Sequence, residues 1–528
     1  MEARPRILVA DGLSEVGLRR LREAAEVEVH RSLDEAALRE RIRGVDALIV
    51  RSQTRVTASV FQAADRLRVV ARAGVGTDNV DVEAATRAGV LVLNTPEASV
   101  RATAEHTLAL LLALCRNIPQ ANAALREGEW ARERFVGTEL YGKTLGIVGL
   151  GRIGSEVARR AQAFGMRVIA HDPYLSDDRA AQLGVTLVPF EILLRESDFI
   201  TLHVPLNPQT RGMLNAEALR KAKRGVRIVN CARGGLVDEE ALLGALEEGH
   251  VAGAALDVFE MEPPLDLRLV RHPRVVATPH LGASTREAQE AIGLEVAEQV
   301  LEALAGRLPR GAVNVAAYRV ESWERVAPHL ELARILGGLS RQLARGRIRS
   351  VEVRLEGELS RVEGQLLSAS FLVGLLEGVV ERTVNLVNAH VVASERGLRV
   401  VEVRQEQAED FSSLMLATTH TDEGTWVLGG TLFGRREPRI VRINEQTIDL
   451  APAPHMLFVW NLDRPGMIGR VGTILGRHAV NIAGMYLGRA APGGVAVMVL
   501  TTDQPTPPEA VEEIRRVDGI YGVQPVQL

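Results

Sequence analysis

The chain has 528 residues, of which 46% are hydrophobic and 25% are charged. Because a single core stops growing near about 250–300 residues, this length predicts three or four domains, and the ordinary composition argues against disorder. The formal net charge of −4 supplies no overall positive field that would attract nucleic acid or anionic lipid. We therefore expect neither a nucleic acid nor a membrane as a partner.

The cysteines and the apolar runs indicate the compartment. Two cysteines, Cys115 and Cys231, argue against a disulfide scaffold in a chain this long and fit a reducing environment. The start of the chain reaches Asp11 after one short apolar run, so no signal-peptide core is expected. The longest apolar run, 108–115, is well short of the ~20 residues that span a bilayer. We expect a cytoplasmic protein.

Alternating strands and helices are predicted from Arg6 to Thr95, which indicates βαβ units and a parallel sheet. One long apolar helix is predicted over 102–125. A second series from Thr144 to Pro279 contains six predicted strands, as in a doubly wound dinucleotide fold. A further helix is expected at 284–305, before the boundary-like run Gly306–Gly311.

The C-terminal part has a different pattern. From about 321 to 450 an α+β order is predicted, with helices near 328–345 and 366–380 and no catalytic cluster. Pro452 and Pro454 mark a linker, and the remaining residues to Leu528 show a βαββαβ order.

A glycine-rich turn follows the first strand of the second series. Gly149, Gly151 and Gly154 form the G-x-G-x-x-G pattern and, with Arg152 and Ile153, lead into a helix. Such a turn lets a pyrophosphate approach the backbone at the positive end of a helix. Asp172 ends the next strand, where a carboxylate can accept hydrogen bonds from a ribose and repel a 2′-phosphate. NAD is therefore favoured over NADP, although Asp172 could instead cap the turn before Pro173.

Four polar residues lie near the ends of later predicted strands: Arg233, Asp257, Glu262 and His280. Singly, a histidine there is more often structural and an arginine is usually solvated. Together they suit the oxidation of a 2-hydroxy acid, because ligands bind at the carboxyl ends of parallel strands. His280 could take the hydroxyl proton, Glu262 could stabilise the charged ring, and Arg233 could hold a carboxylate by two parallel hydrogen bonds.

At these positions the sequence resembles the D-isomer-specific 2-hydroxyacid dehydrogenase family, through segments 148–154, 230–238 and 279–285, and the likeness extends over 4–316. It implies an α/β architecture in which a Rossmann cofactor domain, 96–284, is inserted into a flavodoxin-like substrate domain formed by 1–95 and 285–316. It also implies the triad Arg233, Glu262 and His280, with Asp257 near the nicotinamide. Further expected cofactor contacts are Val75, Val204, Cys231, Ala232, Gly282 and Ala283.

Within the family, segments 51–54, 72–79 and 137–140 are most similar to members that oxidise 3-phosphoglycerate. The resemblance implies a substrate with both carboxylate and phosphate, and a homotetramer. The expected substrate contacts are Arg51, Ser52, Arg72, Gly74, Asn79, Arg132 and Arg134, of which Arg132 and Arg134 could equally be solvated.

The last predicted domain, 453–528, resembles the ACT regulatory domain, and 317–452 resembles the intervening domain of long-chain family members mainly by position and length. Asp463 and Asn481 are the expected contacts of an amino-acid effector, L-serine. Alternatively, Asp463 only caps the turn that follows it. Asn461 stands where some relatives carry a larger aromatic side chain, so the pocket could suit another ligand.

The leading hypothesis is therefore NAD-dependent oxidation of 3-phosphoglycerate to 3-phosphohydroxypyruvate, the first step of serine synthesis, with no bound metal. A glyoxylate or hydroxypyruvate reductase would use the same fold without a phosphate cluster or a regulatory tail. An NADH-sensing binding protein of the same fold would instead show negligible turnover.

Overall fold

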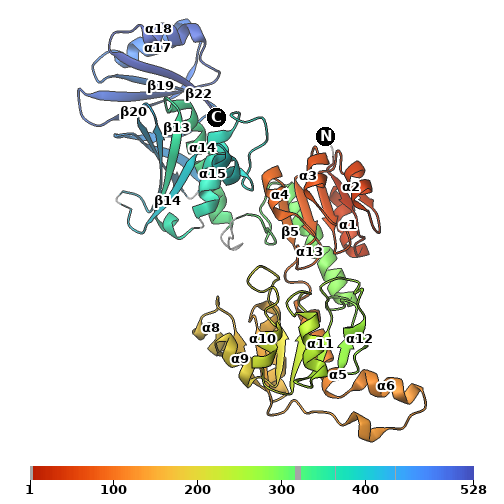
Figure 1. Ribbon diagram of the computed structural model, residues 1–528. Helices are drawn as coiled ribbons and strands as arrows, with labels where there is room; N and C mark the ends of the chain where they lie inside the picture. The colour runs from red at the N-terminus through yellow and green to blue at the C-terminus, as the bar shows by residue number, and fades with distance from the viewer. Residues whose placement is uncertain (1–3, 316–322, 363, 409, 435) are drawn as a thin grey trace.

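The computed structural model describes residues 4–315, 323–362, 364–408, 410–434 and 436–528. Figure 1 shows two α/β bodies, one red and one yellow to green, connected through α13 and neighbouring chain, and a third body in cyan and blue built on a mixed sheet. The predicted α/β architecture with two C-terminal α+β parts is confirmed.

The first body contains a five-stranded parallel sheet in the order β2-β1-β3-β4-β5, the flavodoxin-like order. Helices cover both faces, because one apolar cluster joins the sheet to α1 and α13 and another joins it to α2, α3 and α4. The elements are β1 (Arg6–Val9), α1 (Glu15–Ala24), β2 (Glu26–Val29), α2 (Glu35–Arg41), β3 (Ala47–Val50), α3 (Ala58–Ala63), β4 (Val69–Arg72), α4 (Val82–Ala88), β5 (Leu91–Asn94) and α13 (Arg286–Leu304).

Helix α13 returns to the first sheet after the chain has built the second one. It crosses α1 so closely that a Cβ on Gly17 would lie 2.4 Å from the carbonyl oxygen of Gly293. A bridge between Leu93 and Ala312 then adds the chain after α13 to the edge of the sheet. The first body therefore consists of two separate stretches of sequence.

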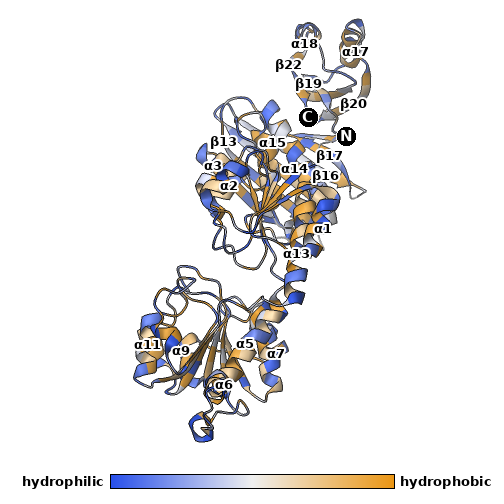
Figure 2. Cartoon of the chain, turned by 90° about the vertical axis from the view of Figure 1, so that its right-hand side faces the viewer, coloured by the Kyte–Doolittle hydropathy of each residue, from blue (hydrophilic) through white to orange (hydrophobic). Residues whose placement is uncertain are grey.

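The second body has seven parallel strands in the order β12-β11-β10-β9-β6-β7-β8, which is the doubly wound arrangement with one additional strand. Figure 2 shows apolar strands between helices whose outer faces are polar. The elements are α5 (Val100–Cys115), α6 (Ile118–Arg126), the 3-10 helix η1 (Arg132–Phe135), β6 (Thr144–Val148), α7 (Arg152–Ala163), β7 (Arg167–His171), α8 (Asp177–Gln182), β8 (Thr186–Leu187), α9 (Phe190–Glu196), β9 (Phe199–Leu202), α10 (Ala216–Lys221), β10 (Val226–Asn230), α11 (Glu239–Glu247), β11 (Val251–Leu256), α12 (Arg268–Arg271) and β12 (Val275–Ala277).

The single helix predicted over 102–125 is wrong, because the chain breaks between α5 and α6. Asn117 takes the left-handed conformation, with φ 52°, and a proline follows within the first turn of α6. In the part of the chain that the structure describes, no single helix is long and apolar enough to cross a membrane; α5 and α6 meet the criteria only as a pair bent by 61°.

The third body contains one ten-stranded mixed sheet, β14-β13-β15-β16-β17-β18-β20-β21-β19-β22. Its elements are α14 (Trp323–Leu343), β13 (Ile348–Gly357), the 3-10 helix η3 (Glu358–Arg361), α15 (Gly364–Leu376), α16 (Ala389–Glu395), β14 (Arg399–Gln405), β15 (Ser413–Thr421), β16 (Thr425–Phe433), β17 (Glu437–Ile443), β18 (Gln446–Leu450), β19 (His455–Leu462), α17 (Met467–Arg477), β20 (Ile482–Arg489), β21 (Val495–Thr502), α18 (Pro508–Arg515) and β22 (Ile520–Gln527).

The two C-terminal parts are joined both by strand pairing and by a common core. Strand β18 meets β20 at the pair Thr447 and Arg489. Phe458 and Val499 belong to the same apolar cluster as Leu336 and Val353, although they lie beyond the predicted linker. The two parts therefore stabilise each other. The domain limits at 95/96, 284/285 and 452/453 stay predictions, and the limit at 316/317 lies outside the described residues.

Candidate active site

The glycine-rich turn lies between β6 and α7, where the sequence predicts cofactor binding. Gly149 has φ 90°, and a Cβ on Gly154 would lie 2.1 Å from the carbonyl oxygen of Gly149. A Cβ on Gly151 would meet nothing within 4 Å, so the space above the first turn of α7 is open. Arg152 is exposed and Ile153 is half-buried in that turn. The free N–H groups there suit a pyrophosphate.

Asp172 and His203 line the same turn from the two neighbouring strands. The Asp172 carboxylate accepts hydrogen bonds from the amides of Leu150 (2.9 Å) and Tyr174 (3.0 Å), so it holds the turn as well as offering oxygen to a ribose. Burial lowers the pKa of His203 to about 3, so its ring is neutral at pH 7, and its buried Nδ1 has no hydrogen-bond partner among the described residues. Val204 follows it beside Gly149. The residues present fit a dinucleotide, and His203 was not predicted as a site residue.

The loop after β10 presents Arg233. The Asn230 side chain shapes this loop, because its oxygen accepts the Ala232 amide (3.0 Å) and its nitrogen donates to the Arg233 carbonyl (2.9 Å). Cys231 is buried, and burial raises the pKa of its thiol to about 12. Such a thiol is not a nucleophile at neutral pH.

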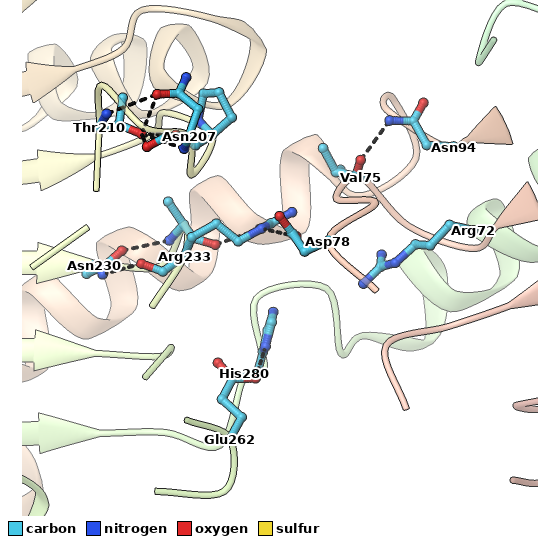
Figure 3. Close-up of polar contacts among 12 residues, drawn as sticks. Arg72, Val75, Asp78, Asn94, Asn207, Thr210, Asn230, Arg233, Glu262 and His280 are labelled. Carbon is cyan, nitrogen blue, oxygen red and sulfur yellow. Dashed lines mark hydrogen bonds and ion pairs between the residues drawn. The ribbon is translucent and has the colours of Figure 1, made fainter. Parts of the chain in front are cut away.

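His280 and Glu262 form the predicted pair. The His280 Nδ1 donates to Glu262 Oε2 at 2.7 Å, and the Phe259 amide donates to Glu262 Oε1 at 3.1 Å. Burial alone would raise the pKa of Glu262, but the hydrogen bond and charge of His280 outweigh it and lower that pKa. His280 has φ 54°, an uncommon conformation that the surrounding loop must hold. Figure 3 shows its ring directed toward the space below Arg233.

Asp257 is fully buried and organises the His280 loop. Its Oδ1 accepts hydrogen bonds from the Thr278 hydroxyl (2.6 Å) and the Leu281 amide (2.7 Å), and its Oδ2 accepts from the Gly282 amide (2.8 Å). His106 Nε2 lies 3.1 Å from Oδ1. Within the described residues the carboxylate is thus already hydrogen-bonded inside the protein. Ala283 follows this loop and is partly buried against the first body's core.

The guanidinium groups of Arg51, Arg72 and Arg233 are close enough for their charges to act on one another. Burial lowers the pKa of Arg72 to about 10, and the positive charges of Arg233 and Arg51 add to this effect. The buried Arg72 Nε has no hydrogen-bond partner among the described residues. The position of this side chain requires glycine at 74, because a Cβ there would lie 1.5 Å from Arg72 Nη1. The group is therefore poised to bind an anion.

Polar side chains fix the loops of the first body: Asn79, which was predicted to contact substrate, and Asp11 and Asn94, which were not predicted. The side-chain nitrogen of Asn79 donates two hydrogen bonds, to the backbone carbonyl oxygens of Arg51 and Thr54, both at 2.6 Å. The Asp11 carboxylate accepts the Arg51 amide at 2.6 Å. Asn94 donates to the Val75 carbonyl at 2.7 Å, as Figure 3 shows. These bonds hold the loop that places Arg51 and Arg72; Ser52 is exposed on it.

The structure does not bring Arg132 and Arg134 to this site. Both lie on η1, beside α6, at the end of the second body that is remote from the first one in Figures 1 and 2. Arg134 pairs with Glu129 and lies over the ring of Phe135. Within one chain, these two arginines cannot contact a substrate held at His280.

The three residues predicted for effector binding do not lie together in one chain: Asn461 and Asp463 are at the end of β19, whereas Asn481 precedes β20 at the level of the start of β19. Asp463 accepts hydrogen bonds from Arg489 and from the Gly493 amide, both at 3.2 Å. Asn481 donates to Asp503 at 2.6 Å. Asn461 is buried, and its oxygen has no hydrogen-bond partner among the described residues.

Comparison with known proteins agrees with the fold and with the site geometry. Residues 108–282 match the model of the D-isomer specific 2-hydroxyacid dehydrogenase NAD-binding domain, 325–444 that of the D-3-phosphoglycerate dehydrogenase intervening domain, and 455–519 that of the ACT domain. D-3-phosphoglycerate dehydrogenase from Synechocystis is 45% identical over 99% of this chain and 95% of that protein. The Bacillus subtilis enzyme of the same name is 44% identical over 99% of both.

Solved structures resemble the first two bodies. The TT0316 protein from Thermus thermophilus superposes with a TM-score of 0.55 and 43% identity, covering 58% of this chain and 99% of that one. D-lactate dehydrogenase from Aquifex aeolicus, solved with NAD and lactic acid, superposes with a TM-score of 0.53 and 29% identity, covering 57% of this chain and 96% of that one.

The fold and the site thus define an NAD-dependent dehydrogenase of the D-2-hydroxyacid class. The full-length similarity goes further than the class. The chain belongs to the D-3-phosphoglycerate dehydrogenase family.

Proposed function

We propose that this protein oxidises 3-phospho-D-glycerate to 3-phosphohydroxypyruvate with NAD. The observation that carries the proposal is the buried Arg72 guanidinium with its unpaired Nε, set beside Arg51 and Arg233. A cluster of guanidinium groups suits a substrate with two anionic ends, because each group can bind a carboxylate or a phosphate by parallel hydrogen bonds. The names of the full-length relatives support the same substrate.

The residues divide the work. Arg233 would hold the carboxylate, and Arg51 and Arg72 the phosphate. His280 would take the hydroxyl proton at its Nε2, because its Nδ1 is engaged by Glu262. The negative charge of Glu262 then stabilises the ring once it is protonated. When bound, NAD accepts the hydride from the substrate carbon.

Initial rates with phosphoglycerate, D-glycerate, D-lactate and glyoxylate test this proposal. Wild-type protein should prefer phosphoglycerate by kcat/KM. Arg51→Gln should raise the KM for phosphoglycerate much more than for D-glycerate, and Arg55→Gln, on the exposed side of the same loop, serves as the matched control. Equal effects of Arg51→Gln on both substrates would mean that Arg51 binds the carboxylate instead.

We further propose that L-serine inhibits through the ACT domain. Asp463 of one copy of the domain would bind the α-amino group and Asn481 of a second copy the carboxylate or hydroxyl, because the two residues lie at opposite ends of β19 within one chain. Inhibition requires that serine bind more tightly to a state with a less closed cleft. Truncation near Pro452 would be a poor test, because it would uncover the core that contains Phe458 and Val499. The full-length variant Asp463→Ala should instead lose inhibition by millimolar serine, whereas the control variant Glu509→Gln should keep it. Unchanged inhibition in Asp463→Ala would contradict the assignment.

Self-association into a homotetramer is supported by one surface. The segment with α6 and η1 exposes large apolar side chains, which soluble monomers rarely gather in one place. They are Ile118, Leu125, Trp130, Val136 and Tyr141. Sedimentation analysis should give the tetramer for wild type and a smaller species for Trp130→Ser; a wild-type monomer would refute this. A cytoplasmic location is supported by two free, buried cysteines.

A further inference from the structure

An ion pair crosses the cleft between the two sheets at the carboxylate-binding arginine. Asp78 lies in the loop after β4 of the first body, and its Oδ2 accepts a hydrogen bond from the Nε of Arg233 at 2.8 Å. Arg233 belongs to the loop after β10 of the second body. Figure 3 shows the two side chains extended toward each other, above His280.

The edge of the Arg233 guanidinium that contains Nε is partly occupied, and one N–H of Nη1 is engaged as well. Asp78 accepts from Nε, and the carbonyl of Ala232 accepts from Nη1 at 2.6 Å. A carboxylate binds a guanidinium most strongly through two parallel hydrogen bonds from one edge. A substrate carboxylate therefore obtains both donors of the edge that contains Nε only when Asp78 leaves.

Asp78 is the acceptor that can leave. Its side chain is 58% exposed, so water can replace Arg233 as its partner, whereas the Ala232 carbonyl belongs to the loop that Asn230 holds. The backbone beside Asp78 is fixed, since Asn79 donates to the carbonyls of Arg51 and Thr54. Release of Arg233 thus requires only a rotation of the Asp78 side chain.

The neighbouring glycine makes room for this pair. A Cβ on Gly76 would lie 1.8 Å from Arg233 Nη2 and 2.6 Å from Asp78 Oδ2. The loop therefore lies directly against both charged groups, and a larger side chain at position 76 would displace one of them.

We infer that Asp78 is an internal competitor for the carboxylate site: it occupies the Nε edge of Arg233 until the carboxylate of the substrate displaces it. Asp78 is thus a residue that sets substrate affinity and selectivity, acting through Arg233. The inference rests on the proposed role of Arg233 as the group that binds the carboxylate. A weak, singly charged anion gains little by displacing Asp78, whereas an acid that is also held by Arg51 and Arg72 can do so.

Oxalate, a dianion that offers a carboxylate to Arg233 but no hydride, is the probe. Its Kd for the NADH-loaded full-length protein is measured by calorimetry for wild type, Asp78→Asn, Asp78→Ser, Asp78→Glu and Glu83→Gln. Glu83→Gln removes one nearby negative charge that pairs with Arg87 instead of Arg233, so it is the matched charge control. Melting temperatures confirm that each variant is folded, and the serine variant substitutes for the asparagine variant if the latter is not.

Asp78→Asn should bind oxalate about two- to fivefold more tightly, the factor that corresponds to an exposed ion pair. The KM of the 2-hydroxy acid should fall while kcat changes little, Asp78→Glu should restore weaker binding, and Glu83→Gln should match wild type. Unchanged or weaker oxalate binding in Asp78→Asn, or an equal gain in Glu83→Gln, would overturn the inference. If wild type fails to oxidise phosphoglycerate yet oxalate binding responds to Asp78 as described, the proposed substrate fails and this inference stands.

Discussion

Asp257→Asn tests how the loop that carries His280 is held. The buried carboxylate accepts backbone hydrogen bonds at both oxygens, from the amides of Leu281 and Gly282. Asparagine has the same shape but replaces one oxygen with an NH2 group. Whichever way the amide is turned, one backbone N–H then faces another donor, and a buried N–H without a partner costs about 1–3 kcal/mol.

The stability that Asp257→Asn loses depends on pH in a defined direction. Burial alone would raise the pKa of Asp257, but the hydrogen bonds from His106, Thr278 and Leu281 outweigh it, so the pKa is lowered in the folded protein. A group whose pKa is lowered by folding stabilises the protein above its unfolded pKa, about 3.9, and loses that contribution as the pH falls through the folded value. The difference between wild type and variant should thus be full at pH 7 and shrink below about pH 4.

Scanning calorimetry is the appropriate assay, because a chain with several domains need not unfold in one step. The transition of the second body should move to lower temperature, and kcat should fall by ~10- to 100-fold, as expected when a catalytic group is misplaced by a fraction of an ångström to 1 Å. Asp198→Asn is the matched control: it replaces one of the two oxygens that accept from the Thr144 amide and from Lys223 in the same body, away from His280, and should lower stability without this loss of kcat. Normal stability and kcat in Asp257→Asn would refute the reasoning.

Three further predictions concern the site. His280→Ala should lower kcat by ~10²-fold or more while NADH affinity, measured by fluorescence titration, stays nearly unchanged; near-normal turnover would remove His280 from the mechanism. Asp172→Ala should weaken NAD binding and reduce the preference for NAD over NADP in initial-rate assays, because the carboxylate repels a 2′-phosphate, and an unchanged preference would contradict its role. Burial raises the pKa of Cys115 to about 11 and that of Cys231 to about 12. Mass spectrometry should therefore find neither thiol alkylated by iodoacetamide at pH 8 until denaturant is added. Rapid modification of the folded protein would show that one of the two thiols is accessible.

The sheets and the pair formed by Glu262 and His280 were predictable because their signals are local. Apolar runs of the right length predicted six of the seven strands in the second body to within one residue at either end, and the two-residue β8 was missed. The strand β2 was missed as well, since its sequence Glu-Val-Glu-Val at the sheet edge lacks a continuous apolar run. Glu262 and His280 are close in sequence and follow neighbouring strands, so the topology alone brings them together.

The remaining features depend on contacts that sequence periodicity does not encode. Asp78 and Arg233 are separated by 155 positions and lie on different sheets. Nothing around Asp78 distinguishes it from a solvated turn residue. The helix break at Asn117 depends on one left-handed residue, and the core common to the two C-terminal parts crosses a proline-rich segment that resembles a linker.

The charges at the cleft predict tighter binding of an acid with two anionic groups than of an acid with a single carboxylate. Arg51, Arg72 and Arg233 bring three positive charges, which Asp11 and Asp78 offset in part. A phosphate monoester carries about −1.5 to −2 at pH 7, so phosphoglycerate with its carboxylate brings roughly −3 and can neutralise all three guanidinium groups after Asp78 has turned away. Lactate or glyoxylate brings about −1, which only replaces the charge of the Asp78 carboxylate that it displaces. The arginines lie in loops of both sheets, so only the larger anion can replace the ion pair between Asp78 and Arg233 with stronger bonds to all three arginines. The same replacement would draw the two sheets together around His280.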